Sequence, residues 1–232
     1  MVAAQIISIP RAALHEQVAL RLRQMLVEGN IAPAAKLNER ELAQVLEVSR
    51  TPLREAIKML AAEGLVELLP NRGAVALSLS ESDVVNTFEV MAGLEAMSGE
   101  LAAQRITGPE LAEIKAMHFE MLAAYTRSDL SGYYRLNALI HRGINAAAKN
   151  PVLSATYNQV NARVQALRFR SNQDGEKWKR AVDEHEQMVD ALSRRDAAAM
   201  RTVLAAHLQN KRDVVLEQLR RESAATRAGA AR

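Results

Sequence analysis

The residues best suited to hold a metal ion are histidines in the second half of the chain. Three of the five histidines, His141, His185 and His207, share a helical face with apolar residues, so each imidazole is expected to point into a helical core. Asn137 precedes His141 by four residues and therefore shares its helix face. A single inward histidine is more often a core residue with one hydrogen bond. Three converging imidazoles with an amide oxygen are better explained by a divalent cation (Zn, Ni, Co or Mn) that keeps coordination positions open for a ligand.

A second group of residues could read DNA. Arg50, Arg54 and Lys58 recur every four residues on one side of a predicted helix, next to a turn. The apolar residues of the other side are Leu53, Ala56, Ile57 and Leu60. An isolated cationic helix face is more often simply solvated. A short helix and turn before it and a hairpin after it favour a reader of the major groove instead, with arginine on guanine or phosphate.

Composition limits where these sites can operate. The chain has 232 residues, 49% hydrophobic and 25% charged, with a net charge of +3, so DNA binding requires positive groups concentrated on one face. With no cysteine, it can form neither a disulfide nor a thiolate metal site. Neither a signal peptide nor an apolar run long enough to span a membrane is evident. We therefore expect a cytoplasmic protein.

The elements that must position the arginines lie before residue 80. Apolar spacing predicts a helix over residues 14–28, a short helix after an N-cap at Asn38, and a third helix over 50–63. Ser49 and Thr51 are both candidate caps for the third helix. Residues 65–69 and 74–79 flank a Pro-Asn-Arg-Gly turn and predict a hairpin. This order of elements is that of a winged helix-turn-helix, which we assign to residues 1–79.

The elements after residue 80 are all helical. A capping box at Ser80 and Asp83 begins the first helix, and caps or breakers divide the rest. The predicted helices cover residues 80–105, 107–125, 128–149, 150–171, 176–193 and 196–221, with a loop at 172–175 and a frayed tail at 224–232. The fold class is therefore mainly α: a winged helix-turn-helix followed by an all-α bundle at 80–232, which would bind metal and effector and form the dimer.

The first part of the chain resembles the GntR family of bacterial regulators. The resemblance rests on Leu37-Asn-Glu-Arg-Glu-Leu-Ala, Val48-Ser-Arg-Thr-Pro-Leu-Arg-Glu-Ala-Ile, Glu63-Gly-Leu-Val and Arg72-Gly, and spans residues 14–79. It implies that DNA is contacted by Arg40, Ser49, Arg50, Thr51, Arg54, Arg72 and Gly73, with Gly73 at the tip of the wing. One departure is Ala34, where the family usually has glycine.

The second part resembles the FCD type of GntR effector domain, over residues 80–218. The pattern appears as Asn137-Ala-Leu-Ile-His141, followed by His185 and His207. The resemblance implies a metal in the bundle whose coordination is completed by an organic acid effector. Asn137 stands where aspartate is common, and Met91 stands where the family often has an arginine that receives the effector carboxylate. Arg135 and Arg142, close to the metal motif in sequence, could replace that arginine or be solvated.

These features together predict a homodimeric transcription regulator that binds operator DNA under the control of a small effector. Two alternatives were considered. A metalloenzyme is disfavoured because no His-Glu-x-x-His spacing is present. A purely structural cation is the other alternative, and the sequence leaves it open. Dimerisation is expected because one recognition helix covers too few base pairs to be specific. We assign no function to His15 or His118 and a packing role to Trp178.

Overall fold

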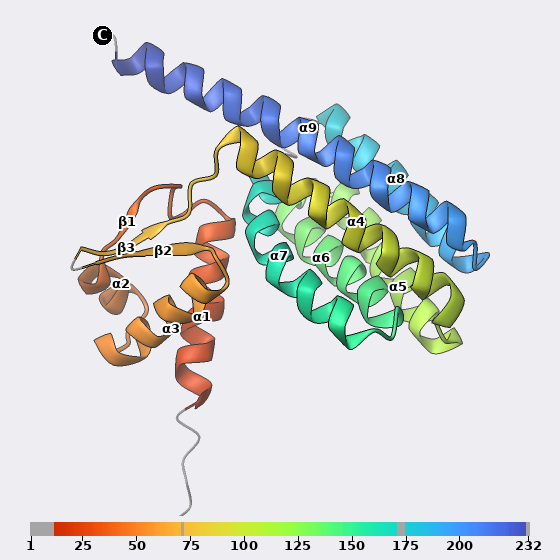
Figure 1. The fold of residues 1–232 in the computed structure, drawn as a ribbon, viewed down its shortest axis with the longest axis horizontal. Helices are drawn as coiled ribbons and strands as arrows, with labels where there is room; N and C mark the ends of the chain where they lie inside the picture. The colour runs from red at the N-terminus through yellow and green to blue at the C-terminus, as the bar shows by residue number, and fades with distance from the viewer. Residues whose placement is uncertain (1–11, 71, 171–174, 231–232) are drawn as a thin grey trace, which may run out of the picture. The chain divides into compact units, whose positions relative to one another are not determined.

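The computed structural model describes residues 12–70, 72–170 and 175–230 (Figure 1). The chain forms two compact units, Met1–Ser78 and Leu79–Arg232, which we call the N-terminal and C-terminal units. The predicted fold class, mainly helical with a winged helix-turn-helix and a helical bundle, is confirmed.

The N-terminal unit is a three-helix core with a small antiparallel sheet. Its elements are α1 (Ala12–Val27), β1 (Lys36–Leu37), α2 (Glu39–Val45), α3 (Arg50–Ala62), β2 (Val66–Leu69) and β3 (Gly73–Ala76). Helix α1 packs on α3, where Leu22, Leu53 and Leu60 are fully buried. The strand order is β1-β3-β2, with Val66 opposite Ala76 and Lys36 opposite Val75. Strand β1 was not predicted, because two residues carry no periodic pattern and form a strand only by pairing with β3.

The helix caps of this unit fix where α2 and α3 begin. The side chain of Asn38 accepts hydrogen bonds from the backbone N–H groups of Arg40 and Glu41, at 3.1 and 3.4 Å, which satisfies donors at the start of α2. Ser49 is the N-cap of α3, in preference to Thr51, and its side chain makes no capping hydrogen bond. The exposed Ser49 hydroxyl therefore lies at the start of the cationic helix.

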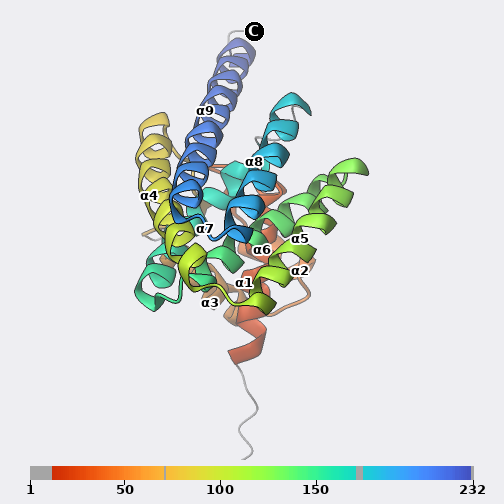
Figure 2. The same cartoon turned by 90° about the vertical axis from the view of Figure 1, so that its right-hand side faces the viewer.

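The C-terminal unit is a helical bundle. Its helices are α4 (Glu81–Arg105), α5 (Gly108–Thr126), α6 (Leu130–Ala147), α7 (Pro151–Arg170), α8 (Gly175–Ser193) and α9 (Ala197–Ala230). Helices α4 and α9 run side by side in both views, while α5 packs on α6 and α8 on α9 (Figures 1 and 2). The predicted capping box of Ser80 and Asp83 is present at the start of α4. A second one, at Thr107 and Glu110, begins α5.

Two buried apolar clusters hold the bundle together. One joins α4, α5, α6, α8 and α9 around Met121, Tyr133 and Met188. Trp178 packs against it, with its ring 5.3 Å from that of Tyr133, as predicted for a packing role. The other joins α4, α7 and α9 and includes the fully buried Met91. Buried polar residues of the same bundle form the candidate site.

A glycine sets how closely α4 and α9 approach. A Cβ at Gly99 would lie 2.3 Å from Cδ1 of Leu204 on α9, so any larger residue would force that side chain to move. The close approach brings the α4 face that carries Glu95 against the α9 face that carries His207.

The end of α9 differs from the prediction. The helix continues to Ala230, so the predicted fraying is wrong over residues 224–230, while residues 231 and 232 lie outside the described residues. This segment is rich in alanine and arginine, which are strong helix formers and prolong a helix that has already begun. Of the loop predicted at 172–175, residues 172–174 lie outside the described residues, and Gly175 already belongs to α8. In the part of the chain that is described, no helix is long and apolar enough to cross a membrane.

Candidate metal centre and DNA-reading surface

Three buried imidazoles meet in the middle of the C-terminal unit. His141 comes from α6, His185 from α8 and His207 from α9, and their ring centroids lie 5.1–5.3 Å apart in pairs. One ligand nitrogen of each lies within 4.8 Å of the others. The structure thus brings together the three histidines that the helical faces predicted. We call them the histidine cluster.

Two buried or half-buried carboxylates hold the Nδ1 atoms of this cluster. Nδ1 of His141 lies 2.8 Å from Oε2 of Glu95, whose side chain is only 2% exposed. Nδ1 of His207 lies 2.6 Å from Oε2 of Glu184. A carboxylate at Nδ1 orients the ring and leaves Nε2 as the nitrogen that can bind a metal, which is the usual outer sphere of a histidine ligand. Nε2 of His141 is buried and makes no hydrogen bond within the described residues.

Electrostatics favour neutral imidazole and ionised carboxylate at Glu184 and His207. Burial lowers the pKa of His207 below its ordinary value, and the hydrogen bond to Glu184 offsets only part of that effect. Burial alone would raise the pKa of Glu184, but hydrogen bonds from His207 and Asn210 and the charge of Arg180 lower it on balance. His207 therefore donates its Nδ1 proton to a carboxylate, and a neutral ring with a free Nε2 lone pair is the form that binds cations.

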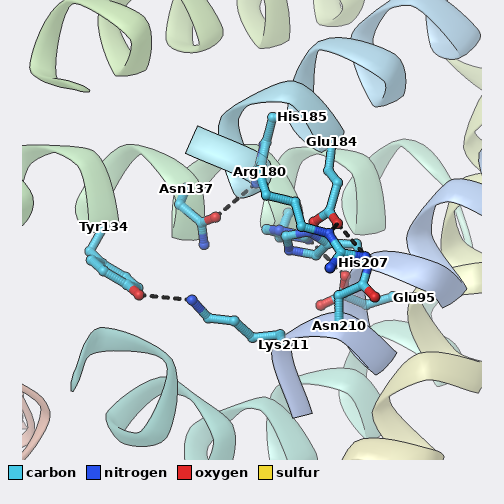
Figure 3. A network of polar contacts seen from close by, with 10 residues as sticks. Glu95, Tyr134, Asn137, Arg180, Glu184, His185, His207, Asn210 and Lys211 are labelled. Carbon is cyan, nitrogen blue, oxygen red and sulfur yellow. Dashed lines mark hydrogen bonds and ion pairs between the residues drawn. The ribbon is translucent and has the colours of Figure 1, made fainter. Parts of the chain in front are cut away.

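Asn137 also reaches the cluster. Its Oδ1 atom lies 2.8 Å from Nε2 of His185, and both side chains are buried (Figure 3). The three imidazoles and this amide oxygen form a nitrogen-rich donor set that fits Zn, Ni, Co or Mn better than a hard cation such as Ca. Nitrogens bound at about 2.1 Å to one tetrahedral ion lie about 3.4 Å apart, so small side-chain movements would complete such a site.

Arg135 and Arg142 do not reach this donor set. Both side chains are exposed on α6, whereas Asn137 and His141 on the same helix are buried. Met91 is fully buried among apolar residues, so a packed apolar side chain stands where the resemblance implies an arginine. A cation does lie nearby on α9: Lys211, one helical turn after His207, is 7% exposed.

The cationic residues of the N-terminal unit lie on its surface. Arg50, Thr51 and Arg54 are exposed on α3, and the opposite face is buried at the four predicted positions Leu53, Ala56, Ile57 and Leu60. Nε of Arg54 donates to Oε2 of Glu39 at 2.8 Å. An exposed pair of this kind contributes only about 0–1 kcal/mol, so it does not hold Arg54 away from DNA.

The remaining residues predicted to contact DNA lie on α2, at the start of α3 and at the turn between β2 and β3. Arg40 is exposed on α2, and Ser49 is exposed at the start of α3. Arg72 and Gly73 are exposed at the turn between β2 and β3, and Gly73 has φ +86°, a conformation that favours glycine. The helix and the hairpin turn thus present cationic and hydroxyl groups of the kind that contact DNA backbones and base edges.

Comparison with known families places both units. Residues 14–75 match the bacterial regulatory proteins of the gntR family, and residues 86–210 match the FCD domain. The chain belongs to the GntR family. This GntR regulator is therefore a DNA-binding transcriptional regulator, and its matches are to regulators and not to enzymes.

Relatives of this regulator extend over most of its length. The HTH-type transcriptional repressor RspR of Escherichia coli K12 is 27% identical over 214 residues, covering 92% of this chain and 93% of the relative. The Nta operon transcriptional regulator of Aminobacter aminovorans is 29% identical over 198 residues, which cover 84% of this chain and 91% of the relative. The solved structure of E. coli McbR/YncC has a TM-score of 0.80 at 22% identity, covering 89% of this chain and 99% of that one, and so shares the fold.

Several residues of the regulator's site escaped prediction. Lys211 follows His207 by four residues, so helical spacing alone could have placed it near the cluster. Glu184 is one residue from His185 and therefore about 100° around the helix, so its contact with His207 depends on how α8 packs on α9. Glu95 gives no such signal, because only the packing of α4 on α6 and α9 brings it to His141.

A separate hollow lies elsewhere in the C-terminal unit of the regulator. It has a volume of about 530 Å³ and is lined by Phe88, Gly93, Arg201 and Arg212, among others, of α4 and α9. Neither the histidine cluster nor its carboxylates line this hollow.

Proposed function

We propose that this regulator binds one divalent metal ion at His141, His185 and His207 and that an organic acid effector at this ion controls its affinity for operator DNA. One observation carries the proposal. Three buried imidazoles face one another, and two of them contact a carboxylate through Nδ1. Packing alone would not require both of these buried charged contacts, whereas a metal site uses them to orient its ligands.

Asn137 is the proposed weaker fourth ligand, through Oδ1. A divalent ion held by four donors or fewer would offer open positions to a carboxylate of the effector. One relative is the gluconate operon transcriptional repressor of Bacillus subtilis, whose name contains a sugar acid, and this fits the proposed class of effector. Arg135 and Arg142 are left out of the effector site because their side chains are exposed.

The proposed DNA interface consists of α3 and the hairpin turn. Arg50 and Arg54 would contact bases or phosphates from α3, with Ser49 and Thr51 on phosphates. Arg40 would add a contact from α2. Arg72 and Gly73 would place the wing against the backbone.

The proposed working form is a cytoplasmic homodimer on palindromic DNA. A two-fold pair of recognition helices reads two half-sites about one helical turn of DNA apart, which one helix cannot do. Only residues 77–80 connect β3 to α4, so a change in the C-terminal unit has a short covalent path to the DNA-reading unit.

A thermal-shift screen of small carboxylates tests the proposal. Metal-loaded protein should be stabilised by its effector, by about 2.7 kcal/mol at 100 times the Kd, whereas chelated protein and a His141→Ala, His185→Ala, His207→Ala variant should not respond. For a chain of this size that gain raises Tm by about 5–10 °C. Elemental analysis of the wild type and the variant is the companion measurement. Equal metal content in both, or an equal carboxylate response with and without metal, would overturn the proposal.

A further inference from the structure

Lys211 places a cation inside the bundle beside the histidine cluster. Its Nζ donates to the hydroxyl oxygen of Tyr134 at 3.1 Å and lies 5.5 Å from the centre of the Tyr134 ring. Figure 3 shows Lys211 extending from α9 toward Tyr134, on the side of the cluster where Asn137 lies. The structure therefore sets a positive group and a phenol next to the donors proposed to hold the metal.

The placement follows from helical periodicity on two helices. Lys211 is four residues after His207 on α9, and Tyr134 is three residues before Asn137 on α6, so each shares a face with its neighbour in the cluster. One helical turn corresponds to about 5.4 Å along the axis. Polar groups thus follow one another along α9 and α6 from the imidazoles to the ammonium group, over about one helical turn.

Helix α7, which packs on α4, α6 and α9, carries a further buried polar group. Asn161 is 5% exposed, and its Oδ1 atom makes no hydrogen bond within the described residues. It follows Tyr157 by one turn, and Tyr157 belongs to the same buried cluster as Leu208, three residues before Lys211. A buried amide oxygen without a hydrogen-bond partner is costly, and a ligand hydroxyl group could supply the missing donor.

An ammonium group and a ligand carboxylate form a charge-assisted hydrogen bond, which is stronger than a neutral one. Because an ammonium group has three N–H donors, it can hold the Tyr134 hydroxyl and a ligand oxygen together. A monocarboxylate bound at the metal would use the histidine cluster alone. A ligand that also reached Lys211 would need a second acidic group about 5 Å from the first, as in a four- or five-carbon diacid.

We propose that Lys211, with Tyr134, receives a second carboxylate and thereby makes the regulator selective for compact dicarboxylates over monocarboxylates. The inference rests on the proposed function, because the first carboxylate is the one at the metal. Tyr134 acts as the positioning residue that holds the ammonium group. The Oδ1 atom of Asn161 favours diacids that carry a hydroxyl group.

Isothermal titration of the metal-loaded full-length protein with succinate, malate and butyrate tests this selectivity. Wild type should bind succinate at least tenfold more tightly than butyrate and malate at least as tightly as succinate. Lys211→Met should bring succinate and butyrate within about threefold of each other, whereas Lys211→Arg should keep the preference. Arg212→Met is the matched control, since it removes the neighbouring cation, which lines the 530 Å³ hollow, and should behave as wild type. Metal content should be the same in all four proteins.

Three results would overturn the inference, and they separate it from the proposed function. Equal binding of succinate and butyrate by wild type refutes the dicarboxylate preference while the metal and carboxylate proposal stands, and this result needs no variant to fold. Loss of the preference in Arg212→Met but not in Lys211→Met would place the acid in the outer hollow. Absence of any carboxylate binding to metal-loaded wild type would refute both proposals together.

Discussion

Removing the charge that faces His141 should weaken metal binding in a graded way. Glu95→Gln keeps an oxygen that can accept from Nδ1 of His141 but loses the negative charge, whereas Glu95→Leu loses both. Changes to such outer-sphere partners reduce metal affinity by about 10–100-fold. Because Oε2 of Glu95 lies 2.8 Å from Nδ1 of His141 and the Glu95 side chain is 2% exposed, we expect Glu95→Gln to weaken metal binding about tenfold and Glu95→Leu about 100-fold. These factors correspond to about 1.4 and 2.7 kcal/mol.

Competition with a chromophoric chelator measures these affinities directly. The matched control is Glu100→Gln on the same helix, because Glu100 is more exposed and pairs with Arg201 at the surface. The control should bind metal as wild type does, and circular dichroism should show that all variants remain helical. Affinities within twofold of wild type for both Glu95 variants would refute the assignment of Glu95 as a partner of a metal ligand.

Three further predictions concern DNA, a turn and pH. Arg50→Ala and Arg54→Ala should each weaken operator binding by about 1–3 kcal/mol if they read bases, measured by fluorescence anisotropy; unchanged affinity in both folded variants would exclude them. Ala34 has φ 60°, which glycine adopts without strain, so Ala34→Gly should raise the free energy of unfolding in urea by about 0.5–1 kcal/mol, and a loss would contradict this. Burial lowers the pKa of His118 and His207, so below pH 6.5 the unfolded chain binds more protons than the native metal-free protein. The urea midpoint of that protein should therefore fall as pH drops from about 7 to 5, and a flat profile would count against buried neutral imidazoles.

Local sequence rules predicted most of the helices and strands, because most of these elements have a characteristic pattern in neighbouring residues. The apolar face of α3 is buried at Leu53 and Ile57 as periodicity required, and Ser80 with Asp83 marks the start of α4. The same reasoning brought the three histidines to one side of their helices. Strand β1 could not be found in this way, because its two residues are ordered by a partner far along the chain.

The site residues that were missed depend on where side chains point around a helix and on how helices pack together. Arg142 is adjacent to His141 in sequence, but one residue turns the helix by about 100°, and its side chain is exposed. Lys211, by contrast, is four residues after His207 and shares its face, so the direction of side chains around α9 would have found it. Which of the chain's 27 acidic residues would meet Nδ1 of His141 is decided by how α4 packs, which no local pattern around Glu95 records.

The most direct test of a metal-dependent sensor is reciprocal titration of operator and effector. An operator duplex selected from a random library with the full-length protein would be titrated with and without a saturating carboxylate from the thermal-shift screen, and the effector would be titrated with and without operator. Linkage requires that both affinities change by the same factor, typically about 5–150-fold, or 1–3 kcal/mol. We predict this coupling in the wild type and its absence in the His141→Ala, His185→Ala, His207→Ala variant, which should still bind operator because its DNA-reading residues are unchanged. A variant that binds operator and still responds to the effector would contradict the account and leave any bound cation with a structural role.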